Sequence, residues 1–577
     1  MIYNKLFFLI SFIFCSNFVF SQADYPQDYF RSPVDIPIYL SGNFGEIRSA
    51  HFHSGIDIKT QGVVGKNVYA AADGYISRIK VSPSGYGNAL YITHPNGYVS
   101  VYGHLQSFKT IVEKYVLEQH YSKKKFSINL FPSSDKFPVS KGEIIGQSGN
   151  SGFSGGPHLH FEIRDAKTEN PINPLLFGFE ISDNISPKIY DLYIYPQNSH
   201  SFVDNRNYSK RIKLTGSKGK YVLQKNRTIS LYGEIGFGLR TYDFLNDSHN
   251  RCGVYSVKVF VDSNLIYFHK LSEFSFSETS YIKSFIDYFE KEKHKRKVQK
   301  NFVEPNNKLS IYKEVKDRGI YEFIDDTFHT VSFEVKDAYE NISTFKFKVK
   351  SSFPENIQAD NDLKDYALAM PFQIQNTFEN DKVKVIIPKN SLFDNLFFEY
   401  SSCSSDLFKY SEIHHIHNIY TPLNKAFTLS IKSDKIPEKY YDKSLIAILD
   451  EENKIINSIG GKLKNGYITA KSAQFGSFAI AIDTIVPEIK RLNIINGKDM
   501  SKYKNIKFKI TDDLSGIKSF IGYIDESWVL FRYDLKKNTI FYNFSDNKIK
   551  KGKQHKLLLF VIDNKDNKAS IEVDFFW

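Results

Sequence analysis

Short runs of alternating apolar and polar residues recur along most of this chain and are typical of β-strands. Apolar side chains at every second position suit strands that bury one face. Between residues 33 and 178, Asn96-Gly97 separates two such runs, which is the strongest short-range hairpin signal. We expect an antiparallel β-sheet or flattened barrel here, with one helix over 110–121. The expected strands are 68–71, 74–81, 89–93, 99–104, 142–147 and 158–164.

One of these strands, 158–164, carries the most informative polar face. Successive side chains of a strand point to opposite sides, so His158 and His160 share one face and the apolar residues between them share the other. Glycine and serine dominate the preceding loop, 149–157, and such small residues let a substrate backbone come close. Two adjacent imidazoles beside this loop indicate a functional site.

His53, Asp57 and His104 lie upstream in turn-like segments that contain glycine. A catalytic zinc ion takes three protein ligands from His, Asp, Glu or Cys and leaves one position for water. Alone, His53 and Asp57 are weak evidence, because Gly55 and the apolar alternation after it favour a loop that enters a strand. Together with the histidine pair of the strand, these residues suggest zinc-dependent hydrolysis.

Three motifs together resemble the lysostaphin/LytM-type zinc metallopeptidases, a family of cell-wall endopeptidases. The motifs are His53-x-x-x-Asp57, Tyr102-Gly103-His104-Leu105 and Gly156-Pro157-His158-Leu159-His160-Phe161-Glu162. The resemblance covers about residues 40–178, and the motifs follow the order of the family. It implies one Zn²⁺ per chain, with His53, Asp57 and His160 as its ligands.

The same resemblance implies roles for other residues of this segment. His104 and His158 would be the catalytic histidines, because an unperturbed pKa of roughly 6.5 suits proton transfer near neutral pH. Which of them acts as general base is left open. Glu162 does not belong to a helical His-Glu-x-x-His motif, so we expect it to orient a ligand or to pair with Arg164. The candidate groove residues are Tyr86, Asn88, Tyr102 and Asn150.

Farther along the chain, two regions look like copies of one module. They share a start, Asp-x-x-x-Pro-x-Ile at 183–189 and 483–489, and an end, Asp-x-x-x-Asn at 337–341 and 563–567. Asp and Asn at such positions form tight turns by bonding their own backbone, which explains them without a bound calcium ion. We predict an immunoglobulin-like β-sandwich for each copy.

The whole chain therefore reads as a mostly β protein of several domains. The segment 107–139 is longer than in compact members of the resembled family, and we expect it to form a lid or a groove wall. The predicted divisions are a signal peptide at 1–21, a LytM-like zinc metallopeptidase domain at 22–178 with the insertion 107–139, an immunoglobulin-like β-sandwich with insertions at 179–354, a β-rich module at 355–482 and a C-terminal immunoglobulin-like β-sandwich at 483–577.

The N-terminus predicts export. Residues 6–14 form an apolar run that is too short to span a membrane stably, and cleavage is expected after Ser21. Bulky residues before Cys15 argue against lipidation there. Cys252 and Cys403 lie far apart, so we expect two free thiols rather than a disulfide framework.

The net charge of +12 suits a partner with negative charge, such as a cell-wall polymer or a membrane surface reached through the C-terminal modules. Nucleic acid is not expected as a partner of an exported chain without a known binding module. The leading hypothesis is an exported zinc endopeptidase that hydrolyses cross-bridges or stem peptides of peptidoglycan. The alternatives are a non-catalytic LytM-type regulator of another cell-wall hydrolase and a secreted protease of protein substrates. The oligomeric state is not constrained by the sequence.

Overall fold

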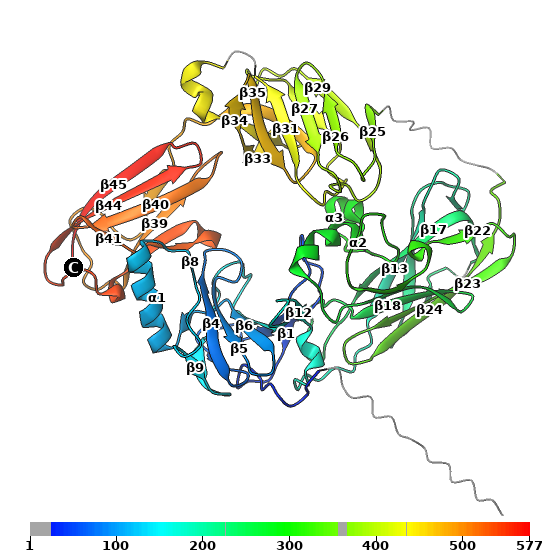
Figure 1. Ribbon diagram of the computed structural model, residues 1–577, viewed down its shortest axis with the longest axis horizontal. Coiled ribbons are helices and arrows are strands. Elements are labelled where there is room, and N and C mark those ends of the chain that lie inside the picture. The colour runs from blue at the N-terminus through cyan, green and yellow to red at the C-terminus, as the bar shows by residue number, and fades with distance from the viewer. Residues whose placement is uncertain (1–24, 226, 356–365, 434–435) are drawn as a thin grey trace, which may run out of the picture.

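The computed structural model describes residues 25–225, 227–355, 366–433 and 436–577. The expected signal peptide and Cys15 lie outside the described residues. Four β-rich units follow one another around a ring, and the fourth returns to the helix of the first (Figure 1). The prediction of a mostly β protein is confirmed. Among the described residues, no helix has the length and apolar character needed to cross a membrane.

The first unit, residues 25–181, contains the histidine-rich motifs. Its larger sheet has the order β1 (Leu40–Gly42), β2 (Ile56–Lys59), β11 (His158–Asp165), β6 (Tyr98–Gly103), β5 (Asn88–Thr93), β4 (Gly74–Val81) and β8 (Ile128–Leu130), with β12 (Pro171–Ile172) beside β11 and β9 (Pro138–Val139) beside β4. A smaller sheet has the order β3 (Asn67–Tyr69), β10 (Ile144–Gln147) and β7 (Ser107–Phe108). The pairings in both sheets are antiparallel, as predicted.

The segment 107–139 does not form a lid over the histidines. Its strands β8 and β9 extend the edge of the sheet beside β4, and its helix α1 (Thr110–Lys123) faces the fourth unit. The Tyr121 hydroxyl donates a hydrogen bond to Asp546 Oδ2 at 3.3 Å, and the Tyr121 ring meets Trp528 edge-on with centroids 5.2 Å apart. The insertion therefore contacts the fourth unit, and it also forms part of the wall of a cavity of about 540 Å³ that Asn88 and Asn150 line.

The second unit, residues 182–355, is one large sheet that folds over its own core. Helices α2 (Ile282–Phe285) and α3 (Tyr288–His294) lie in a long insertion. The strand order is β14 (Phe202–Val203), β17 (Ile229–Tyr242), β13 (Lys188–Pro196), β15 (Lys210–Ser217), β16 (Lys220–Leu223), β24 (Ile342–Ser351), β23 (Phe328–Lys336), β18 (Ser256–Val261), β19 (Asn264–Lys270) and β21 (Tyr312–Val315), with β20 (Gln299–Lys300) and β22 (Tyr321–Phe323) beside β17.

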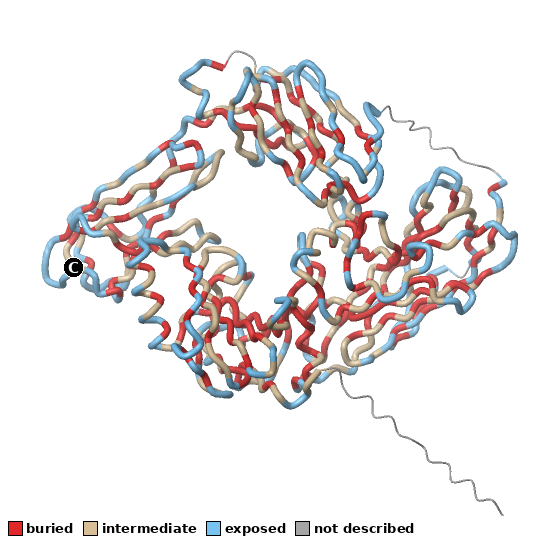
Figure 2. Tube along the Cα trace, viewed as in Figure 1, coloured by how far each residue is buried: buried red, intermediate tan, exposed pale blue. Residues whose placement is uncertain are grey.

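The first and second units share an aromatic core. Phe44 and Phe52 from the first unit pack against Phe274 and Phe285 from the second, and all four side chains are buried. Figure 2 shows buried segments inside each unit and also where these two units meet. Because a shared core excludes water from both partners, these two units form one continuous body.

The third and fourth units each place two sheets on one core. In the third unit, one sheet has the order β26 (Asn376–Glu379), β27 (Val383–Ile387), β31 (Phe427–Lys432), β35 (Tyr467–Ser472), β34 (Lys462–Lys464). The other has the order β29 (Tyr400–Cys403), β30 (Ile413–Ile416), β36 (Gly476–Ile482), β32 (Ser444–Leu449), β33 (Ile455–Gly460), and β25 (Leu368–Met370) pairs with β28 (Leu396–Phe398). In the fourth unit, one sheet has the order β37 (Glu488–Arg491), β39 (Asn505–Thr511), β43 (Thr539–Asn543), β42 (Arg532–Asp534). The other has the order β38 (Lys498–Asp499), β45 (Lys568–Phe576), β44 (Gln554–Asp563), β40 (Ile517–Ile524), β41 (Ser527–Val529). Cys252 and Cys403 are free thiols.

Candidate metal centre

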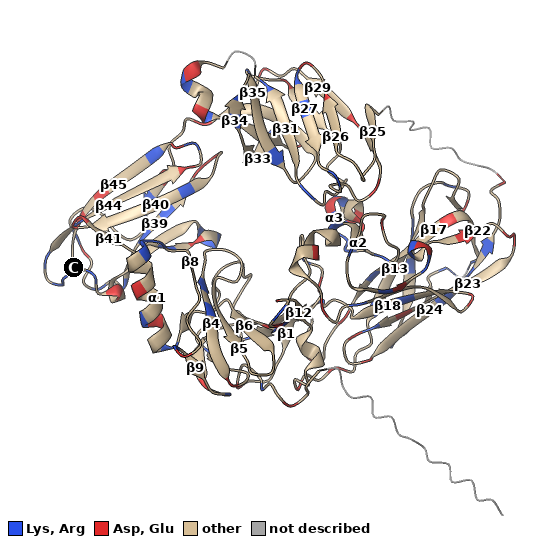
Figure 3. Cartoon of the chain, viewed as in Figure 1, with Lys and Arg blue, Asp and Glu red and all other residues tan. Residues whose placement is uncertain are grey.

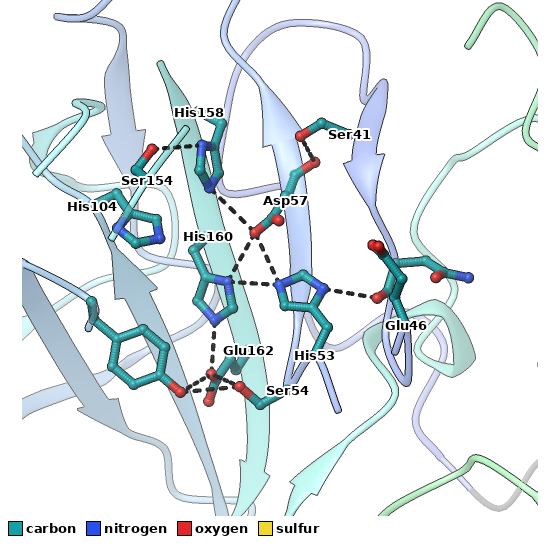
Figure 4. A network of polar contacts seen from close by, with 12 residues as sticks. Ser41, Glu46, His53, Ser54, Asp57, His104, Ser154, His158, His160 and Glu162 are labelled. Atoms are coloured by element: carbon teal, nitrogen blue, oxygen red, sulfur yellow. Dashed lines mark hydrogen bonds and ion pairs between the residues drawn. The ribbon is translucent and has the colours of Figure 1, made fainter. Parts of the chain in front are cut away.

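Strand β11 lies between β2 and β6 and presents its polar face as the alternation predicts. Leu159 and Phe161 are fully buried in the core on the opposite face. The antiparallel register places His160 directly opposite Asp57 of β2 and opposite Gly103 of β6. Residues that lie opposite each other in neighbouring strands point to the same side of the sheet. Pairing alone therefore brings an imidazole and a carboxylate together (Figure 4).

Three atoms of His53, Asp57 and His160 meet at one point. His53 Nε2 lies 3.0 Å from Asp57 Oδ1 and 3.1 Å from His160 Nδ1. Asp57 Oδ1 and His160 Nδ1 are 2.9 Å apart. All three residues are buried. This triad is a cluster of the kind that can hold a metal ion.

The hydrogen bonds behind the triad assign the tautomer of each histidine. His53 Nδ1 donates to the backbone oxygen of Asn43 at 2.8 Å, and His160 Nε2 donates to Glu162 Oε1 at 2.7 Å. In neutral imidazole only one ring nitrogen carries a hydrogen. The nitrogens that face Asp57 therefore carry lone pairs. Burial alone would lower the pKa of His160, but the hydrogen bonds to Asp57 and Glu162 raise it to about 9. A positive charge, carried by a proton or by a metal ion, is therefore favoured between these three atoms.

His158 and His104 flank the triad on the same cavity. His158 Nδ1 donates to the backbone oxygen of Gly156 at 2.9 Å, and its Nε2 lies 3.3 Å from Asp57 Oδ1. His104 Nδ1 donates to the backbone oxygen of Ser151 at 2.8 Å. The two rings meet edge-on with centroids 4.7 Å apart. In each neutral ring the lone pair is therefore on Nε2, which in His158 faces Asp57.

Burial and neighbouring groups shift the pKa values of residues in the site. Burial alone would raise the pKa of Asp57, but the surrounding histidines hold it well below its usual range. Burial lowers the pKa of His104 to about 3, and the neighbouring histidines add to this effect. His104 also has a left-handed backbone, with φ at 59°. A non-glycine residue held in this region costs about 1–3 kcal/mol, and such strain clusters at functional sites.

Glu162 fixes the orientation of His160. Its Oε1 accepts hydrogen bonds from His160 Nε2 at 2.7 Å, Tyr86 Oη at 2.6 Å and Ser54 Oγ at 2.5 Å. Its Oε2 accepts from Arg164 Nε at 2.6 Å. Burial would raise the pKa of Glu162, but the Arg164 charge and these donors hold it below its usual range. Both alternatives expected for Glu162 are thus present at once.

The second unit reaches the site through Asn43. The Asn43 side chain pairs with the backbone of Gly253, donating to its oxygen at 2.7 Å and accepting from its nitrogen at 2.7 Å. The same Asn43 accepts the His53 hydrogen bond through its backbone oxygen. Phe276 and Thr279 of the second unit also line the site cavity, which has a volume of about 730 Å³. Sequence reasoning missed these residues because no local pattern signals a contact across 210 positions.

Two of the predicted groove residues, Tyr86 and Tyr102, have different environments. The Tyr86 ring lines the cavity with its centroid 5.0 Å from that of His160. Tyr102 is fully buried, and its hydroxyl accepts a hydrogen bond from the Ala71 nitrogen at 2.8 Å. The expectation that Tyr102 lines the groove is therefore corrected. Tyr102 lies opposite Phe161 in the register, on the core face of the sheet.

The other two predicted groove residues, Asn88 and Asn150, lie farther from the triad. They line a second cavity of about 540 Å³ between the first and fourth units. Lys536 of the fourth unit donates to Asn150 Oδ1 at 3.0 Å and to the Ser154 oxygen at 3.3 Å. Ser154 Oγ in turn lies 3.2 Å from His158 Nδ1. The fourth unit therefore touches the loop that carries the site, without entering the site cavity.

Parts of this chain match known protein families and individual proteins. The model of Peptidase family M23 matches residues 51–120 and 128–174, and that of the Zu5-like domain matches residues 367–483. DD-carboxypeptidase/endopeptidase Mpg of Neisseria meningitidis serogroup B is 36% identical over 123 residues, which are 21% of this chain and 22% of the relative. Peptidoglycan DD-endopeptidase ShyA of Vibrio cholerae is 29% identical over 164 residues, or 27% of this chain and 32% of the relative.

Among solved structures, the catalytic domain of a mutant of the prophage-encoded M23 protein EnpA from Enterococcus faecalis matches 25% of this chain and 95% of its own. The sequence identity is 23% and the TM-score is 0.19. The match to the first relative covers only about a fifth of that protein's length. The M23 model thus matches the unit that carries the histidine cluster, and the Zu5-like model matches the third unit.

Proposed function

We propose that this chain, whose residues 51–120 and 128–174 form a Peptidase family M23 domain, is an exported zinc endopeptidase that cleaves peptide bonds of peptidoglycan. The observation that carries this proposal is the meeting of three lone-pair atoms, from His53, Asp57 and His160, at the wall of a cavity. Two relatives that the matched unit resembles bear the name peptidoglycan DD-endopeptidase, which supports the choice of substrate.

His53, Asp57 and His160 would hold the metal ion. Two neutral imidazoles and one carboxylate are donors that suit Zn²⁺ and leave a coordination position for water. When bound, zinc makes a water molecule acidic near neutral pH and polarises a carbonyl group. Glu162 keeps His160 in the tautomer whose Nδ1 faces the metal position.

His104 and His158 would move the protons of the reaction. Each has its Nδ1 fixed by a backbone oxygen, so its Nε2 is the atom that exchanges protons with the attacking water or with the leaving amine. Burial favours the neutral form of His104. General acid–base groups of this kind contribute about 10²–10⁴-fold to a rate. Which histidine acts first is left open.

The charge of the chain supports a polymeric substrate of negative charge. The net charge is +12, and Figure 3 shows lysine and arginine residues distributed over all four units. We propose that the later units associate with the wall or a membrane surface by this diffuse attraction. The two alternative functions, a non-catalytic regulator and a protease of proteins, are less well supported, because five residues suited to catalysis line one cavity.

The test separates the two histidines of β11. We expect His160→Ala to lose bound zinc and all hydrolysis of purified sacculi. We expect His158→Ala to retain about one zinc per chain and to lose roughly 10²–10⁴-fold in rate. Zinc is measured by elemental mass spectrometry, and released peptides are identified by mass spectrometry from a mixture of sacculi and proteins. Unchanged hydrolysis by His160→Ala, or cleavage of the proteins alone, would contradict the proposal.

A further inference from the structure

Three aspartates meet where the second unit joins the first. Asp183 precedes β13, Asp243 follows β17, and Asp337 follows β23. One carboxylate oxygen from each lies within 4.8 Å of the others. Asp243 and Asp337 are each only 2% exposed. Water therefore does not screen the repulsion between these carboxylates.

Several oxygen atoms of this cluster have no partner. Among the described residues, no hydrogen bond reaches Asp243 Oδ1 or Asp183 Oδ2, although both atoms are buried. The buried hydroxyl of the adjacent Tyr339 also lacks a partner in the described part of the chain. Burying charged oxygen atoms without compensation is costly, and native structures rarely leave such atoms unpaired. Two unpaired oxygens in one carboxylate cluster therefore point to a bound cation.

We propose that Asp183, Asp243 and Asp337 bind one calcium ion. The donors are exclusively oxygen atoms, which hard cations prefer, whereas structural zinc sites use nitrogen and sulfur. Magnesium retains most of its water and is usually held by one or two carboxylates, so three convergent carboxylates favour calcium. This site is separate from the histidine cluster and does not depend on the proposed peptidase activity.

The fourth unit contains a second cluster at the equivalent positions, Asp483, Asp512 and Asp563. The Asx turn is the same in both copies. The Asn341 nitrogen donates to Asp337 Oδ1 at 2.9 Å, and the Asn567 nitrogen donates to Asp563 Oδ1 at 2.8 Å. The turn alone therefore does not distinguish a metal site from a structural turn.

The two clusters differ in how well their oxygens are satisfied. Asp483 Oδ2 accepts from the Ser515 nitrogen at 3.2 Å, whereas the equivalent Asp183 Oδ2 has no partner among the described residues. Asp512 Oδ1, like the equivalent Asp243 Oδ1, is buried without a partner in the described part of the chain. Lys565 occupies the place of Tyr339 and brings a buried ammonium group that donates to the Gly461 oxygen at 2.9 Å. The second cluster thus leaves one buried carboxylate oxygen unpaired among the described residues where the first leaves two, and we expect it to bind calcium more weakly.

The position of the first cluster gives the ion a structural role. Each aspartate is followed or preceded within two residues by a side chain that packs in the core of the first unit, namely Ile181, Leu245 and Tyr339. The Asp243 nitrogen also donates to the Cys252 oxygen at 3.0 Å, next to Gly253, which holds Asn43. Calcium would tie these three strand ends together and fix the segment that supports His53.

The experiment titrates CaCl₂ into the full-length, zinc-loaded protein by calorimetry. We expect one dominant site with a Kd between about 0.1 µM and 1 mM, the range of sensors and extracellular modules. Asp243→Asn should weaken it at least tenfold, and Asp512→Asn, the matched change in the fourth unit, should leave it unchanged. Asp183→Asn is a second variant of the same cluster and should also weaken calcium binding. It removes one carboxylate charge but retains the hydrogen bond that Oδ1 accepts from the Ile185 nitrogen.

Amide hydrogen exchange locates the site independently of these variants. Calcium should slow exchange in residues 243–254 and 337–341, and zinc content should stay constant. Absence of binding by the wild-type protein at about 10 mM CaCl₂, roughly ten times the weakest expected Kd, would overturn the proposal. Loss of the dominant site in Asp512→Asn but not in Asp243→Asn would overturn it as well, because calcium would then occupy the fourth unit.

Discussion

The second and fourth units contact the first unit in contrasting ways. The second unit shares an aromatic core with it, in which Phe274 lies 5.0 Å from Phe44 and 5.5 Å from Phe52 between ring centroids. The fourth unit makes mainly polar contacts, such as those of Lys536 with the loop at Asn150. The first contact is a shared buried core, whereas the second borders a cavity of about 540 Å³. The second unit is thus a permanent part of the site, whereas the fourth unit is positioned to adjust it.

This difference explains how a similar turn motif can occur in two modules with separate tasks. In the second unit the segment after Asp243 leads to Gly253, which supports a histidine of the metal centre through Asn43. In the fourth unit the corresponding cluster adjoins Lys565, which contacts the third unit, and other residues, Lys536 and Asp546, touch the first unit. A shared fold element therefore does not imply a shared contribution to the site.

The largest expected effect comes from opening the aromatic core. Phe274→Ala removes a ring that is 1% exposed, and such cavities cost about 3–5 kcal/mol of the free energy of unfolding. Trp528→Ala is the matched change at the other contact and should cost only about 1 kcal/mol. Denaturant unfolding followed by hydrogen exchange measures both. Equal losses for the two variants would show that the contacts do not differ in kind.

The next effect concerns the support of His53. Asn43→Ala removes both hydrogen bonds to Gly253 but retains the backbone oxygen that holds His53. Zinc affinity should therefore fall by less than the factor of about 10–100 that loss of the outer partner itself causes. Competition with a zinc chelator measures the affinity. Asn150→Ala, which cuts a contact with the fourth unit, is the control and should leave zinc affinity unchanged. A similar loss in both variants would contradict a special role for the second unit.

Acid should weaken the shared core before it affects the polar contact. His269 is buried against Phe285, with ring centroids 5.3 Å apart, and burial lowers its pKa to about 3. The unfolded chain binds the proton more readily, so stability falls by about 1.4 kcal/mol for each pH unit below about 6.5 until the folded pKa is reached. Thermal unfolding between neutral and mildly acidic pH tests this. His269→Phe should flatten the dependence, and an unchanged slope would refute the assignment.

The smallest effect is expected from the polar contact itself. Lys536→Ala releases the backbone oxygen of Ser154, whose hydroxyl lies 3.2 Å from His158 Nδ1. Partly exposed charged contacts contribute roughly 1 kcal/mol or less, so kcat/KM should fall by no more than about fivefold. Zinc content should not change. A loss of zinc would mean that the fourth unit supports the metal centre directly.

The sequence predicted those parts of the site that depend on local periodicity. His158 and His160 share a face because alternation is a property of any strand, and the motif order placed Asp57 beside them. Tyr102 was misplaced because its face depends on its partner across β6 and β11, Phe161, and register is not visible in one strand. Of the two roles expected for the segment 107–139, the lid is wrong, but the segment does line a cavity together with Asn88 and Asn150. Its contact with the fourth unit was not visible in the sequence.

Long-range contacts account for the remaining differences. Asn43 has no motif around it, and only the fold brings it to Gly253, 210 residues away. The aspartates at 337 and 563 were explained as turn residues, which the structure bears out, because both accept the expected backbone hydrogen bonds. The unpaired oxygens of Asp183 and Asp243 became visible only when three separate strand ends met.

Strand β11 also restricts how this chain can change in length. It is hydrogen-bonded on both sides, and the loss or gain of one residue would turn every later side chain to the opposite face. Leu159 or Phe161 would then face Asp57, and His160 would enter the core. Insertions and deletions are thus excluded from this strand but tolerated in exposed loops. In a sequence alignment of relatives, β11 should form an ungapped block whose neighbours vary in length.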